Sequence, residues 1–176
     1  MSKLKLKSLI KEAFEGVGGI ITTPAIHNLD GSFSSKKTIN EGTRWNVGIE
    51  EPNGKVTAVY GHYDGYPQWV GKILKSSYSN SSKVKLLLKL GKNGISTLDK
   101  SMKGGKDHSF DNPQKGETVF YGRDRGEKGS MTMKYKNIEE FGEDFQQKYG
   151  AEYGYIWSVK NKKWTMFDYR GNRKEL

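Results

Sequence analysis

Residues 44–63 constrain the fold more than any other stretch, because they predict a β-hairpin. Apolar residues alternate with polar or small ones across 45–49, which is the period-two pattern of a strand with one buried face. The turn Pro52-Asn53-Gly54 follows, and asparagine and glycine tolerate the positive φ angles that a tight turn requires. Residues 55–63 then return as the second strand. A chain with this hairpin is expected to build its core around a sheet.

The other patterns place helices between hairpins. They predict helices over 67–78, 80–90 and 137–150, strands over 118–121 and 131–135, and a second hairpin over 153–168. Asn80 and Asn137 are the expected N-caps, and Glu140 completes a capping box with Asn137. Because helices and strands do not alternate strictly, we predict a single α+β domain with a mainly antiparallel sheet of five or six strands and three to four helices.

The core domain is expected to span residues 44–170. Before it, residues 1–43 predict an N-terminal amphipathic helix over 3–15 and an irregular connector. This helix would pack on its own domain or on a second copy of the chain, so a homo-oligomer is left open. After the core, residues 171–176 predict a basic tail. Within the core, the polar loop 100–117 is expected to be the most mobile segment.

Composition narrows the class of protein. The chain holds 10 Tyr, 7 Phe and 4 Trp, so aromatic rings must supply much of the buried area. It has no cysteine, which excludes disulfides, thiolate metal ligands and thiol nucleophiles. No apolar run approaches the roughly 20 residues that cross a bilayer. We therefore expect a soluble protein of the cytoplasm with no membrane partner.

The charge is strongly positive and unevenly distributed. The formal net charge is +10. The segment from Lys83 to Lys106 is rich in lysine, whereas most of the charged residues within 137–152 are acidic. Such a field attracts nucleic acid, nucleotides or other anions. The alternative is a lysine-rich surface that only faces water.

One candidate half-site lies where the first hairpin ends. Tyr60, His62, Asp64 and Tyr66 fall within seven residues, and Pro67 follows at an expected helix start. His62 and Asp64 would share a face if the strand continued, and a carboxylate beside the imidazole would raise the histidine pKa. The alternative is structural, with Asp64 capping the next helix.

A second candidate half-site follows the strand at 118–121. Arg123 and Arg125 flank Asp124 between two glycines, and guanidinium groups suit phosphate or carboxylate. If both strands end on the same side of the sheet, the two half-sites would converge on one anion-sized pocket. The alternative is a cluster in which Asp124, Glu127 and the arginines neutralise one another.

Other chemistries are less well supported by the sequence. The three histidines show no metal-ligand spacing, and no phosphate-loop or dinucleotide-binding signature is present, so we expect no metal and no cofactor. Nucleic-acid or host-protein binding through the lysine-rich faces is the second hypothesis. A hydrolase that uses His62 and Asp64 is the third.

Several blocks resemble a family of small, uncharacterised proteins from bacteriophages and their hosts. The blocks are YGHYDGYP (60–67) with VGKIL (70–74), GISTL (94–98), FYGRDRGE (120–127) and AEYGY (151–155). The resemblance covers about residues 44–168. It implies a phage accessory protein that acts in the bacterial cytoplasm, where counter-defence is a common task.

These observations together favour one function over the others. We expect a non-enzymatic accessory protein that binds an anionic small molecule, such as a nucleotide-type immune signal of the host. The expected ligand-binding residues are Tyr60, His62, Asp64, Tyr66, Arg123 and Arg125.

Overall fold

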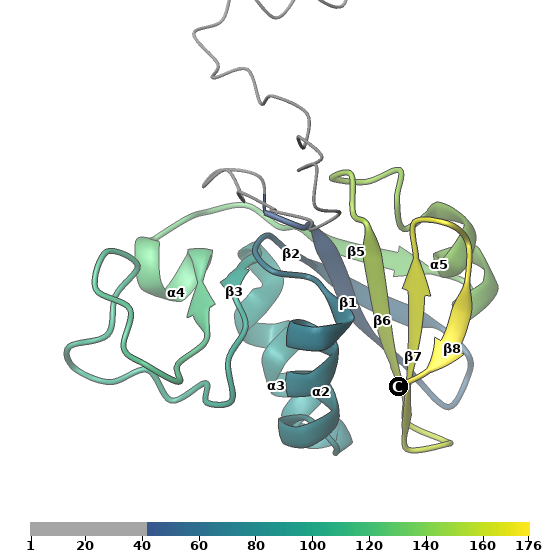
Figure 1. Ribbon diagram of the computed structural model, residues 1–176, viewed down its shortest axis with the longest axis horizontal. Coiled ribbons are helices and arrows are strands. Elements are labelled where there is room, and N and C mark those ends of the chain that lie inside the picture. The colour runs from purple at the N-terminus through teal and green to yellow at the C-terminus, as the bar shows by residue number, and fades with distance from the viewer. Residues whose placement is uncertain (1–41) are drawn as a thin grey trace, which may run out of the picture. The chain divides into compact units, whose positions relative to one another are not determined.

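The computed structural model describes residues 42–176, which form one compact unit (Figure 1). The predicted helix 3–15 and most of the connector lie outside these residues. The strands are β1 (Trp45–Glu50), β2 (Val56–Gly61), β3 (Ile95–Thr97), β4 (Val119–Phe120), β5 (Thr132–Tyr135), β6 (Tyr153–Ser158), β7 (Lys163–Asp168) and β8 (Arg173–Glu175). The helical elements are a π-helical turn η1 (Pro67–Gly71), α2 (Lys72–Ser77), α3 (Ser81–Leu90), a 3₁₀ turn η2 (Gly91–Asn93), α4 (Tyr121–Arg125) and α5 (Ile138–Asp144).

All eight strands belong to one sheet, so the predicted α+β class is confirmed. The strand order is β4-β3-β2-β1-β6-β7-β8, and β5 pairs with β2 beside β3. Only β1·β6 and β2·β3 are parallel pairs, and the others are antiparallel. The predicted strand number of five or six was too low because β3 and β8 are three residues long, too short to show a period. β8 lies in the predicted basic tail. It is an exposed edge strand without apolar residues, so its sequence shows no strand pattern.

The predicted first hairpin is confirmed, and its turn sets the register of the sheet. Gly54 has a φ of 83°, and the turn is closed by the Glu51 amide, which donates to the Lys55 carbonyl at 2.9 Å. Trp45 therefore lies opposite Gly61. β1 is central in the sheet and pairs with β2 and β6, so nearly all its residues are buried and not only the alternating apolar ones.

Helices cover both faces of the sheet. In Figure 1, α2 and α3 lie together while α5 lies apart from them, beyond β7. One apolar cluster joins Trp45, Val47 and Ile49 of β1 to residues of η1, α2 and α3. The second cluster joins Val56 and Ala58 of β2 to α5. Aromatic rings are prominent in both clusters, as the composition predicts.

The helix boundaries follow from their caps. Asn80 accepts a hydrogen bond from the Lys83 amide and Asn137 from the Glu140 amide, both at 2.8 Å, so both predicted N-caps are confirmed. The predicted helix 137–150 is too long, because α5 ends at Asp144 and both Tyr149 and Gly150 have φ values of 63°. The helix after Pro67 starts as a π-helical turn, and Trp69 within it is 45% exposed. Within residues 42–176, no helix has the length and apolar character needed to cross a membrane.

Candidate functional site

The ends of the two strands that precede the predicted half-sites meet at the start of β3. The end of β2 pairs with the start of β3, where Gly61 lies beside Ile95, and the end of β4 pairs at the same point, where Phe120 lies beside Ile95. β2 and β4 run in opposite directions, but the offset of β3 brings their carboxyl ends together. The two strand ends are therefore adjacent, although the strands do not end on the same side of the sheet as the sequence hypothesis assumed.

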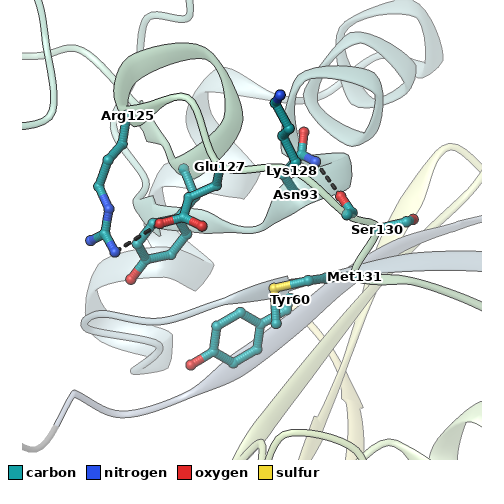
Figure 2. Close-up of a pocket in the computed structure, with 9 residues that line it drawn as sticks. Tyr60, Asn93, Arg125, Glu127, Lys128, Ser130 and Met131 are labelled. Carbon is teal, nitrogen blue, oxygen red and sulfur yellow. Dashed lines mark hydrogen bonds and ion pairs between the residues drawn. The ribbon is translucent and has the colours of Figure 1, made fainter.

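A pocket of ≈ 380 Å³ lies at this meeting point (Figure 2). Tyr60 comes from β2, Asn93 from η2 and Arg125 from α4, so three separate elements contribute. Figure 2 shows Tyr60 and Met131 along one side, facing Arg125 and Glu127 across the space. Its lining consists of Tyr60, Asn93, Tyr121, Arg125, Glu127, Lys128, Gly129, Ser130 and Met131.

Arg125 is held in a defined position at the pocket. Its guanidinium carbon lies 4.7 Å from the ring centre of Phe110 and 5.5 Å from that of Tyr121. Its Nη2 forms an ion pair with Glu127 Oε1 at 2.8 Å, and both side chains are more than two-fifths exposed. Stacked guanidinium groups keep their in-plane donors free for other partners. Arg125 can therefore offer donors to an anion that replaces Glu127.

Arg44, Tyr60 and His62 form a polar chain beside the pocket. The Tyr60 hydroxyl lies 2.5 Å from His62 Nδ1, and the Arg44 side chain hydrogen-bonds to Tyr60. Arg44 can only donate, so it donates to the Tyr60 oxygen. The direction of the hydrogen bond between Tyr60 and His62 Nδ1 depends on the tautomer of His62. Burial raises the pKa of Tyr60 even though Arg44 acts to lower it, so the phenol stays protonated.

The structure reverses the predicted pKa direction for His62. Burial, and secondly the charge of Arg44, lower its pKa below the ordinary value. The prediction was wrong because β2 ends at Gly61 and Asp64 has a φ of 55°, so strand alternation does not continue to Asp64. Tyr60, two residues before His62, is the neighbour that shares its face.

A pH dependence follows from the lowered His62 pKa. As pH falls through about 6.5, histidine in the unfolded chain gains a proton before His62 in the folded protein does. The free energy of unfolding should therefore decrease with falling pH, until the pH reaches the lower folded-state pKa. Urea titrations between pH 7.5 and 5 should show this slope in the native protein and a smaller one in His62→Gln. Equal slopes would contradict the prediction.

The other predicted residues lie apart from the pocket. Tyr66 is 39% exposed, and its ring centre is 6.3 Å from that of Tyr153 on β6. Asp64 precedes it in the turn that leads to η1. Neither residue lines the pocket, and neither does Arg123.

Arg123 has a structural role. Its guanidinium donates to the Met102 carbonyl at 2.7 Å, to the Thr118 carbonyl at 3.0 Å and to the Asp124 carboxylate at 2.7 Å. Burial acts to raise the pKa of Asp124, but hydrogen bonds from Arg123 and the Phe120 amide outweigh it and the pKa is lowered. These contacts anchor the loop 100–117, so the structural alternative holds for the pair Arg123 and Asp124.

Replacing Arg123 by alanine should therefore destabilise the fold. Asp124 is only 4% exposed and would lose its charged donor, while two carbonyl oxygens would lose theirs. We expect a loss of about 2–3 kcal/mol in the free energy of unfolding, measured in urea. Arg125→Ala is the matched control and should change stability by less than about 1 kcal/mol. An equal loss in both variants would contradict this assignment.

Sequence reasoning missed Arg44 and Tyr121. Arg44 precedes β1, and the hairpin register that pairs Trp45 with Gly61 places it across from His62. The Asn53-Gly54 turn could have revealed this pairing. Tyr121 separates β4 from the arginines, and its ring lies 6.4 Å from that of His62. Nothing in the local pattern marked it as a pocket residue.

Among residues 42–176, no group of three or more His, Cys, Asp or Glu side chains is arranged to hold a metal ion. Comparisons of the chain with protein-family models, with curated proteins and with solved structures found no match.

Proposed function

We propose that this protein binds an anionic small molecule with an aromatic ring, of the nucleotide class, and does not transform it. The observation that carries the proposal is the pocket of ≈ 380 Å³ in which Tyr60 and Arg125 line one space. This volume falls within the range of about 300–1,000 Å³ that is typical of small-molecule sites. His62 and Arg44 adjoin the pocket through Tyr60.

The lining suits both parts of such a ligand. Tyr60, Tyr121 and Met131 supply aromatic and thioether surface for a planar ring. Arg125 and Lys128 supply positive charge, and Asn93 and Ser130 supply polar groups. The Glu127 carboxylate already occupies a position on Arg125 that a ligand carboxylate or phosphate could take.

The polar chain suits recognition of a ligand. His62 Nδ1 is already engaged by the Tyr60 hydroxyl, which leaves one ring nitrogen of His62 for contact with a ligand. A general base must accept a proton from its substrate or from water, so the fate of the ligand after incubation separates binding from hydrolysis. The resemblance to phage proteins suggests a biological context. In that context, the protein would sequester a nucleotide signal of the host in the bacterial cytoplasm.

A panel of mononucleotides and of linear and cyclic dinucleotides tests the proposal by thermal shift. A ligand at 100 times its Kd stabilises a protein by about 2.7 kcal/mol, which corresponds to a rise in Tm of roughly 5–10 °C for a chain of this size. The shift should be much smaller in Arg125→Ala and unchanged in Lys85→Ala. Chromatography of the ligand after long incubation should recover it intact. No shift with any nucleotide would refute the proposal, and conversion of the ligand would favour the hydrolase alternative.

A further inference from the structure

Aromatic side chains continue from the pocket along the same end of the sheet. At this end β2 and β7 finish and β1 and β6 begin. We call the following set the ring row: Phe110, Tyr121, His62, Tyr63, Tyr60, Tyr149, Tyr66, Tyr153 and Tyr169. Neighbouring ring centres within it lie 4.2–6.4 Å apart in two groups, from Phe110 to Tyr149 and from Tyr66 to Tyr169.

The two groups of rings are adjacent through β1 and β6. The Glu152 amide donates to the Arg44 carbonyl at 2.8 Å, which places Tyr153 next to the residue that contacts Tyr60. Tyr60 lies on the α5 side of the sheet. Tyr153 packs against the first apolar cluster, on the opposite side, where α2 and α3 lie. The ring row therefore passes over the end of the sheet near Arg44.

Arginines accompany the rings at both ends of the row. Arg125 lies over Phe110 and Tyr121, and the Arg170 guanidinium carbon lies 5.3 Å from the ring centre of Tyr169. Two of the acids at this end are already engaged, Glu127 with Arg125 and Asp168 with Asn172. Glu152, beside Tyr153, is exposed. At each end of the row, an arginine therefore lies directly against an aromatic ring.

The exposed apolar surface of the described chain is also mainly aromatic. Its exposed large hydrophobic residues are Tyr66, Trp69, Leu86, Tyr149 and Tyr169, with exposed fractions of 39–48%. Three of them belong to the ring row, and Trp69 follows Tyr66 in η1. Exposed rings with interleaved cations are the pattern that binds stacked bases and phosphates.

We propose that the ring row binds single-stranded nucleic acid laid across the end of the sheet. From β4 to β7 the sheet spans five strand intervals, or about 24 Å at ~4.8 Å per interval, which is room for several nucleotides. Bases would stack on the exposed rings, and phosphates would contact Arg44, Arg125 and Arg170. This proposal goes beyond the pocket ligand, because the half of the row from Tyr66 to Tyr169 lies outside the pocket.

Fluorescence anisotropy with a labelled oligothymidylate of about 15 nucleotides, near the upper site size of small single-strand-binding domains, tests the proposal. Binding should weaken steeply as salt increases. Tyr169→Ala and Arg170→Ala should each lower the affinity about fivefold or more. Trp69 is the exposed tryptophan of the described chain, whereas Trp45, Trp157 and Trp164 are at most 3% exposed, so quenching of tryptophan emission would report binding near η1.

Lys85→Ala is the matched control, because it removes one positive charge at the opposite end of the sheet. Lys85 pairs with Glu51, which follows β1, whereas the ring row lies where β1 begins. No anisotropy change at low salt, or an equal loss in Arg170→Ala and Lys85→Ala, would overturn the proposal. Tyr169→Ala should leave the thermal shift with mononucleotides unchanged. Failure of the oligonucleotide assay is therefore distinguishable from failure of the pocket proposal.

Discussion

Replacing Arg125 by alanine is expected to lower the affinity for an anionic nucleotide about ten- to a hundredfold while leaving the fold intact. Hydrogen bonds from a charged donor contribute about 1.5–3 kcal/mol when the partner is an anion. Phe110 and Tyr121 already hold the guanidinium in place, so little side-chain freedom is lost on binding. Isothermal titration of the native protein and the variant with the best ligand of the panel would measure the change.

Glu127 allows the same prediction to be tested in the opposite direction. Because its carboxylate is paired with Arg125 at 2.8 Å, a ligand anion must compete with it. Glu127→Gln removes that competing charge and should strengthen binding by up to about tenfold. If Arg125→Ala binds as tightly as the native protein, or if Glu127→Gln binds more weakly, Arg125 does not contact the anion.

The fold could be predicted where local patterns were strong. Asn53-Gly54 set the first hairpin, and Asn80 and Asn137 marked helix starts through side-chain bonds to amides three residues later. β3 and β8 could not be predicted in this way, because three residues show no period and their pairing depends on distant strands. The missing β3 matters most, since its position between β2 and β4 places the ends of both strands beside Ile95, next to the pocket that Tyr60 and Arg125 line.

Site residues were predictable as types but not as roles. Arg123 and Arg125 are two residues apart in the same short helix, and the sequence presents them as equivalent. They differ because the Met102 and Thr118 carbonyls take up the donors of Arg123, whereas Arg125 reaches the pocket. Met102 is 21 residues from Arg123 along the chain, so no local pattern could separate a structural arginine from one that can bind a ligand.

Gly61→Ala should cause the largest loss of stability, because the indole of Trp45 covers the position of a side chain at residue 61. A Cβ there would overlap the Trp45 ring atoms Cε2, Cζ2 and Cδ2. Trp45 cannot move aside easily, since it is fully buried and its Nε1 donates to the Tyr63 carbonyl at 3.1 Å. We expect the free energy of unfolding in urea to fall by about 3 kcal/mol.

Gly61→Ala should also weaken ligand binding, because Gly61 is the last residue of β2 and lies between Tyr60 and His62 in the chain. Gly71→Ala is the matched control. Its Cβ would lie 3.3 Å from the tip of Leu176 and make ordinary contacts with Tyr155 at 3.5 Å and Pro67 at 3.6 Å. Because alanine also favours a helix, stability should change by less than about 1 kcal/mol. If the Trp45 ring causes the loss, Gly61→Ala should cost far less when Trp45 is already replaced by leucine. Residues in contact are expected to show an interaction energy of about 0.5–3 kcal/mol in such a pair of backgrounds. Equal losses of stability in both backgrounds would mean that the clash with Trp45 is not the reason for glycine at position 61.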